Sequence, residues 1–260
     1  MVTGLAVFRE HFAGHADQFV LIGGTAATLA MEEVGLEFRA TKDLDIVLHI
    51  EALSPAFGAL FWRFVEAGRY EIRQASSTGK PMLYRFQKPA DEGFPVMLEL
   101  FCRAPNGIHL AEGAHLTPIP IDDAIASLSA ILVDDVYYEF ILTGRKEVDG
   151  LPIVGEDRLI PLKARAWLDL TERREKGEHV DARDIRKHAN DALRLSQLLA
   201  PGTHLPVAVG IANDLNRFLN GIGADPSIDP KAIMLGASVA AVLDRIAQAY
   251  DLRPRRAAPS

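Results

Sequence analysis

The hydrophobic pattern of the chain changes shortly after its midpoint. Before this change, short runs of branched and aromatic residues lie between Gly, Pro, Asn and Asp breaks, which is typical of strands. After it, segments with helical spacing follow one another to near Leu252. This order predicts an α+β domain at residues 1–155, a helical bundle domain at residues 156–252 and a frayed tail at residues 253–260.

Individual elements follow from the same periodicities. In the α+β part the pattern predicts helices at residues 5–17, 25–36 and 53–68, and strands at residues 19–22, 44–50, 70–75, 82–88, 95–103 and 131–142. In the second part it predicts helices at residues 159–177, 181–199, 206–222 and 230–252.

Charge and cysteine content exclude some classes of protein. The net charge of -7 gives no support for a broad nucleic-acid-binding surface, although a local basic patch remains open. Cys102 is the single cysteine, so no internal disulfide can form, which fits a reducing compartment. The N-terminus lacks the pattern of a signal peptide, and no run is long enough for a membrane-spanning helix. We expect a cytoplasmic protein without a membrane partner.

A strand-to-helix turn in "VLIGGT" is the first candidate binding site. Gly23 and Gly24 let the backbone approach a ligand closely, and Thr25 brings a hydroxyl to the start of the next helix. Free amides at a helix N-terminus favour an anionic group such as phosphate. The pattern equally fits a tight turn with Thr25 near the helix cap, so it needs support from other residues.

Two aspartates, Asp43 and Asp45, lie one residue apart in "TKDLDIVL". On a strand both side chains point to one side, with Leu44 on the other. Neighbouring carboxylates repel each other unless a cation lies between them, and Mg²⁺ commonly joins one or two carboxylates to substrate phosphates. The alternative is that solvated aspartates cap the strand, or that they pair with Arg39 or Lys42.

Glu99 is the only charged residue in the apolar run "PVMLELFC". A carboxylate on a buried strand is costly without a partner. Taken alone, Glu99 indicates an edge strand or an ion pair with Arg103 or Arg85. Beside a strand that carries Asp43 and Asp45, it would complete a cluster of three carboxylates. Such a cluster can hold one or two divalent ions for in-line attack on phosphorus.

The order of these features resembles the nucleotidyltransferase superfamily of the polymerase-beta type. In that superfamily a glycine pair holds nucleotide phosphates, and two aspartates with a third carboxylate bind the metals. The resemblance implies a nucleotidyltransferase-type mixed sheet with flanking helices. It assigns phosphate contacts to Gly23, Gly24 and Thr25. It assigns Mg²⁺ or Mn²⁺ ligands, which are also catalytic residues, to Asp43, Asp45 and Glu99.

One subgroup is more similar in its spacing. The sequence separation between Gly24 and Asp43 is long, and Arg39 precedes the aspartates. Both features resemble the AbiEii-type toxin nucleotidyltransferases of type IV toxin–antitoxin and abortive-infection systems. Those proteins place a helical domain after the transferase core. The resemblance covers roughly residues 18–200. It implies that Arg39 contacts the nucleotide.

In the same subgroup a lysine on one helix and an Arg/Lys-Asp pair at the start of the next complete the site. The resemblance therefore makes Lys163 a nucleotide-binding residue and Asp184, beside Arg183, a catalytic residue. Structural roles remain open for each of them. Lys163 could cover apolar neighbours at the surface, and Asp181 could cap the helix with Asp184 as a capping-box partner.

The resemblance implies transfer of a nucleoside monophosphate from an NTP to an RNA end, such as that of a tRNA, or to a protein hydroxyl. A toxin of this kind would be expected to have a cognate antitoxin. Two alternatives stay open: a catalytically inactive nucleotide-binding regulatory module, and a small-molecule nucleotidyltransferase of the antibiotic-modifying kind. An acidic cleft in the helical domain favours a small molecule, whereas an open groove lined by Arg165, Arg183 and Lys187 favours RNA.

Overall fold

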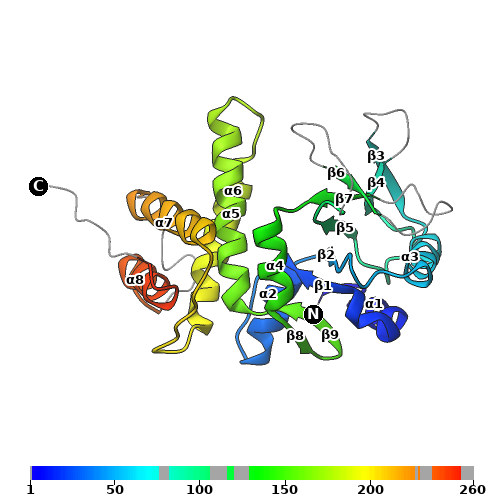
Figure 1. Cartoon of the computed structure of the whole chain (residues 1–260), viewed down its shortest axis with the longest axis horizontal. Helices are drawn as coiled ribbons and strands as arrows, with labels where there is room; N and C mark the ends of the chain where they lie inside the picture. The colour runs from blue at the N-terminus through cyan, green and yellow to red at the C-terminus, as the bar shows by residue number, and fades with distance from the viewer. Residues whose placement is uncertain are drawn as a thin grey trace, which may run out of the picture. The chain divides into compact units, whose positions relative to one another are not determined.

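The computed structural model describes residues 2–75, 82–105, 116–119, 129–225, 228 and 236–252 (Figure 1). The chain divides into two compact units, Met1–Gly155 and Glu156–Ser260. The predicted tail at residues 253–260 lies outside the described residues. No helix in the described ranges has both the length and the apolar character that crossing a membrane requires.

The first unit is built on a mixed sheet. Its strands are β1 (Phe19–Ile22), β2 (Asp43–Leu48), β3 (Glu71–Ala75), β4 (Met82–Gln87), β5 (Met97–Cys102), β6 (Leu116–Pro118), β7 (Ser129–Leu132), β8 (Arg145–Val148) and β9 (Leu151–Val154). Within the described residues they pair in the order β3-β4-β5-β2-β1-β9-β8, and β7 joins β5 to β6. The pairs β2–β5, β1–β9 and β5–β7 are parallel, and the others are antiparallel.

Helices flank this sheet, as the sequence predicts. They are α1 (Leu5–Phe12), followed by a 3-10 segment (Ala13–Gln18), α2 (Gly23–Glu33), α3 (Pro55–Gly68) and α4 (Asp135–Thr143). In α3, Ser54 caps the first turn and Pro55 occupies the first helical position, where its missing N–H costs nothing. The predicted mixed sheet with flanking helices is confirmed.

An aromatic core covers one face of the sheet. Phe8 and Phe12 of α1 pack against Phe64 of α3, and Phe61 of α3 packs edge-on against Phe86 of β4. Residues of the strands that are paired in register point to the same face, so the Phe86 face includes Leu98, with which Phe86 pairs. Glu99, the next residue along β5, therefore belongs to the opposite face.

The predicted strand at residues 131–142 is wrong. Only its start belongs to a strand, β7, and the rest forms α4. Asp134 ends the extended segment, because its carboxylate accepts hydrogen bonds from the backbone N–H groups of Val136 and Tyr137. Tyr138 and Ile141 then lie on one buried side at helical spacing. The aromatic and branched residues suggested a strand, but the cap and this spacing favour the helix.

Replacing Asp134 with alanine removes the cap of α4. We expect the free energy of unfolding to fall by about 1 kcal/mol, the usual value of an N-cap side chain. Chemical denaturation followed by circular dichroism measures the change. Asp134→Ser retains an oxygen acceptor and should lose only a small part of that stability. Equal losses in the two variants would contradict a capping role.

The second unit is helical. It contains α5 (Glu156–Glu175), α6 (Ala182–Leu195), a 3-10 turn (Ser196–Leu198), α7 (Val209–Ala224) and α8 (Val239–Ala249). Trp167 of α5 packs edge-on against Phe218 of α7. A β-carbon on Gly221 would lie 2.5 Å from the Trp167 ring, so glycine lets these two helices approach. The C-terminal helical region expected from the sequence is confirmed.

Candidate functional site

The glycine turn lies beside the start of β2. Strands β1 and β2 are antiparallel, with Ile22 opposite Asp45, and both lie in the middle of the sheet (Figure 1). Gly23 follows Ile22 and has a φ of 69°, in the left-handed region that favours glycine. A β-carbon on Gly23 would overlap Asp45 Oδ2 and lie 2.8 Å from Asp45 Cγ. The Asp45 carboxylate therefore rests directly against the backbone of the turn.

Two further observations place the turn against β2 and the segment before it. The Thr25 hydroxyl, which is fully buried, donates a hydrogen bond of 2.8 Å to the backbone oxygen of Asp43. A β-carbon on Gly24 would lie 2.5 Å from Thr41 Oγ1 and 3.5 Å from Arg39 Nη2. The structure thus brings Gly23, Gly24, Thr25 and Arg39 together with the aspartates. Thr25 fastens the turn to β2, a role that differs from the helix cap considered from the sequence.

The helix that follows the turn begins at Gly23, two residues earlier than the sequence predicts. The N-cap residue of α2 is Ile22, whose apolar side chain makes no cap hydrogen bond. The amides of a first helical turn favour an anion, and the helix dipole adds to the attraction.

The two aspartates have the alternating arrangement that the sequence predicts. Asp43 and Asp45 are partly exposed, whereas Leu44 between them is fully buried. Both aspartates therefore lie on the face of the sheet opposite the aromatic core. This leaves two carboxylates at one strand start, on the same side and within reach of solvent.

Glu99 lies on the same face, one strand away. In the parallel pair β2–β5, Asp45 and Glu99 are opposite each other. Glu99 is 9% exposed and forms an ion pair with Arg85 of β4, in which Arg85 Nε donates to Glu99 Oε1 at 2.6 Å. Of the options open from the sequence, the structure has the ion pair with Arg85. Arg103 instead pairs with Glu51.

The carboxylates suit a hard divalent cation, although one of the three is already in an ion pair. Carboxylate oxygens are the ligands that Mg²⁺ prefers, and Asp43 and Asp45 offer a pair of them. In the described part of the chain, no three His, Cys, Asp or Glu side chains converge as a ready metal site. Glu99 is adjacent but pairs with Arg85 through Oε1, so as a ligand beside Asp43 and Asp45 it would share its carboxylate with that guanidinium.

Lys163 lies within the second unit and is engaged there. Its ammonium group is 3.0 Å from Asp191 Oδ2, and the two residues are 5% and 0% exposed. The sequence interpretation missed Asp191. A signal for it exists, because Asp191 lies one helical turn before the buried Leu195, on the inner side of α6. A lone carboxylate on an apolar helix face requires a cationic partner.

Asp184 occupies an exposed position in the first turn of α6. The helix is capped by Asp181, which accepts a hydrogen bond of 2.8 Å from the backbone N–H of Arg183. The Arg183 guanidinium also pairs with Asp181, and this lowers the pKa of the Asp181 carboxyl. The capping role considered for Asp181 is therefore present, and Asp184 remains at the surface of its unit.

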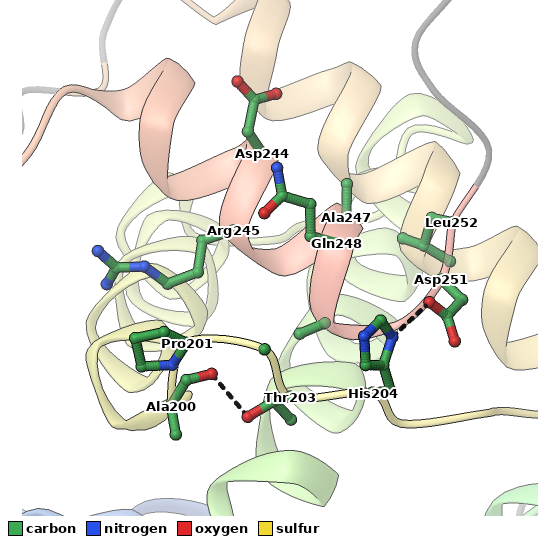
Figure 2. Close-up of a pocket in the computed structure, with 12 residues that line it drawn as sticks. Ala200, Pro201, Thr203, His204, Asp244, Arg245, Ala247, Gln248, Asp251 and Leu252 are labelled. Carbon is green, nitrogen blue, oxygen red and sulfur yellow. Dashed lines mark hydrogen bonds and ion pairs between the residues drawn. The ribbon is translucent and has the colours of Figure 1, made fainter.

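A separate hollow of about 710 Å³ lies in the second unit, between α8 and the segment before α7 (Figure 2). Its lining includes Thr203, Arg245 and Gln248, and His204 pairs with Asp251 at 3.0 Å. None of the predicted site residues lines it. The hollow carries both signs of charge and points to no particular ligand.

Comparison with known proteins gives little further information. No family model and no curated protein matches the chain. Among solved structures, the chain is similar to JHP933 from Helicobacter pylori, with 17% sequence identity and a TM-score of 0.32. That match covers 95% of this chain and 90% of JHP933. Function must therefore be argued from the site alone.

Proposed function

We propose that the protein is a metal-dependent nucleotidyltransferase. The observation that carries the proposal is the close approach of the Gly23 backbone to the Asp45 carboxylate. It brings the N-terminus of α2, a kind of site suited to phosphate, against a carboxylate pair suited to Mg²⁺. Nucleotide transfer needs these two elements side by side, since the carboxylates would hold a metal that neutralises charge on the triphosphate.

In this proposal the phosphates of an NTP lie against Gly23 and Gly24, with Arg39 as a neighbouring cation. Asp43 and Asp45 hold Mg²⁺ or Mn²⁺, which neutralises charge on the phosphates when bound. An acceptor hydroxyl attacks the α-phosphorus, its proton passes to a base, and pyrophosphate leaves. The protein contributes mainly by positioning these groups. Lys163 and Asp184 belong to the second unit, and their assignment as site residues stays a prediction from the family resemblance.

The acceptor and the biological role rest on that resemblance as well. We propose an RNA end or a protein hydroxyl as the acceptor, and a toxin-like role with a cognate antitoxin as partner. Incubation with each labelled NTP, Mg²⁺ and either total RNA or total protein identifies both the nucleotide and the acceptor class. Growth arrest on expression, relieved by the same substitutions that stop label transfer, would support the toxin-like role.

Asp45→Asn is expected to lower label transfer by about 1,000-fold or more, because loss of a metal ligand removes several kcal/mol of transition-state stabilisation. Initial rates at saturating NTP measure the effect. Asp149→Asn is the matched control: it makes the same change at an exposed hairpin residue that pairs with Arg9. Full activity of the Asp45 variant would exclude the proposed metal site.

One observation favours a second candidate, a nucleotide-binding module without turnover. Glu99 and Lys163, both predicted site residues, are each engaged in an ion pair within the protein. A module that only senses nucleotides could keep the turn and the two aspartates and leave these residues in structural roles. Tight NTP binding by the wild-type protein without transfer to RNA or protein would identify it.

A further inference from the structure

Three side chains form a row across neighbouring strands, which we call the polar row: Arg85 of β4, Glu99 of β5 and Asp45 of β2. Arg85 is opposite Glu99 in the antiparallel pair, and Glu99 is opposite Asp45 in the parallel pair. In-register partners share a face of the sheet. Glu99 therefore has a cation on one side and the proposed metal-binding carboxylate on the other.

Glu99, the central residue of the polar row, requires a cationic partner. The Glu99 side chain is 12% exposed, and a charge so far removed from water requires a compensating partner. Arg85 provides it through two N–H groups, Nε and Nη2, which both donate to the same oxygen, Glu99 Oε1. This arrangement holds Glu99 beside Asp45 before any metal arrives.

Arg85 also has a second partner that does not depend on Glu99. Its guanidinium carbon lies 5.8 Å from the centre of the Tyr84 ring, within the range of a cation–π contact. The Arg85 side chain is 26% exposed, so its charge retains contact with water. Arg85 can therefore release Glu99 without becoming an isolated buried charge.

We infer that Arg85 is a positioning residue that competes with the divalent cation for Glu99. The inference rests on the proposed metal site at Asp43 and Asp45. With Arg85 in place, a cation at the aspartates that takes Glu99 as a ligand must share this carboxylate with a guanidinium, whose positive charge repels it. Arg85 thus weakens metal binding in the absence of substrate, while it holds the third carboxylate in position.

Mn²⁺ binding to the full chain without nucleotide tests the inference, with free Mn²⁺ measured by electron paramagnetic resonance. Arg85→Met should bind Mn²⁺ about tenfold more tightly than the wild type or better, because the guanidinium that shares Glu99 and repels the cation is gone. Mn²⁺ should also raise the melting temperature of Arg85→Met more than that of the wild type. If Arg85 had only a structural role, replacing it would not increase the affinity for Mn²⁺.

Three further variants define the effect. Adding Glu99→Gln to Arg85→Met should abolish the gain, since the competed ligand is then absent. Lys88→Met is the matched control, because it removes one positive charge from an exposed ion pair with Glu71. It should leave Mn²⁺ affinity unchanged. Arg85→Lys, which retains the charge with weaker geometry, should give an intermediate gain and covers the case in which Arg85→Met does not fold.

The outcomes separate the inference from the proposed function. If wild-type Mn²⁺ binding depends on Asp45 but Arg85→Met and Arg85→Lys bind no more tightly, the competition is refuted and the metal site stands. Weaker binding by the Arg85 variants also refutes it. If neither the wild type nor the Arg85 variants bind Mn²⁺, the inference and the proposed metal site both fail.

Discussion

Asp191→Ala is expected to lower the free energy of unfolding by about 3–5 kcal/mol, because it leaves the buried Lys163 ammonium without its carboxylate. The loss is large because both groups are removed from water, and a buried charge without its counter-charge retains the full cost of desolvation. Denaturant unfolding followed by circular dichroism measures the change. The fluorescence of Trp167, which lies on α5 with Lys163, follows the same unit.

A double variant serves as the control. Lys163→Met with Asp191→Leu replaces both charges by apolar groups of similar size and should recover most of the lost stability. Arg165→Met, on the same helix as Lys163, breaks a partly exposed pair with Asp214 of α7 and should cost less than about 1 kcal/mol. If Asp191→Ala cost no more than Arg165→Met, the buried pair would not be a stabilising element of α5 and α6.

Gly23→Ala is expected to reduce nucleotide transfer by about 100-fold, the effect of displacing a reacting group by roughly 1 Å. The new methyl group would occupy the position of Asp45 Oδ2, so the carboxylate or the turn must move. The positive φ at Gly23 adds about 1–2 kcal/mol of backbone strain. Transfer rates and the unfolding midpoint are measured on the same preparations.

Gly35→Ala separates these two contributions. Gly35 has a φ of 73°, close to that of Gly23, but a β-carbon there would meet no atom within 4 Å. The Gly35 variant should therefore show the strain alone, with activity retained. Equal activity of the two alanine variants would mean that the contact between Gly23 and Asp45 has no part in catalysis.

The central strands were predictable because burial is the dominant requirement on their residues. Val20 and Leu21 of β1, and Ile46 and Val47 of β2, are almost completely buried, and continuous branched runs of this kind indicate a central strand. By contrast, the strand β6 is only three residues long and carries little pattern. The β8–β9 hairpin depends on Asp149 and Gly150, both with positive φ, a turn signal that the interpretation did not use.

The residues of the candidate site also differ in how readily the sequence predicts their contacts. The glycine turn, Asp43 and Asp45 are close in sequence to elements that are themselves readily predicted, so their meeting follows from the antiparallel pairing of β1 with β2. Partners across long sequence distances are harder to find. Choosing Arg85 over Arg103 for Glu99 required the strand register, and pairing Lys163 with Asp191 required the packing of α5 on α6.

The buried thiol of Cys102 provides an internal probe of the strand that carries Glu99. Cys102 ends β5, three residues after Glu99, and it is completely buried. Burial raises the pKa of its thiol to about 12, despite a smaller opposing effect of Arg103. A thiol in this state reacts with alkylating reagents only when the strand opens. The rate of alkylation therefore reports how often β5 separates from the sheet. The dependence of this rate on nucleotide and metal can be followed without introducing another residue as a probe.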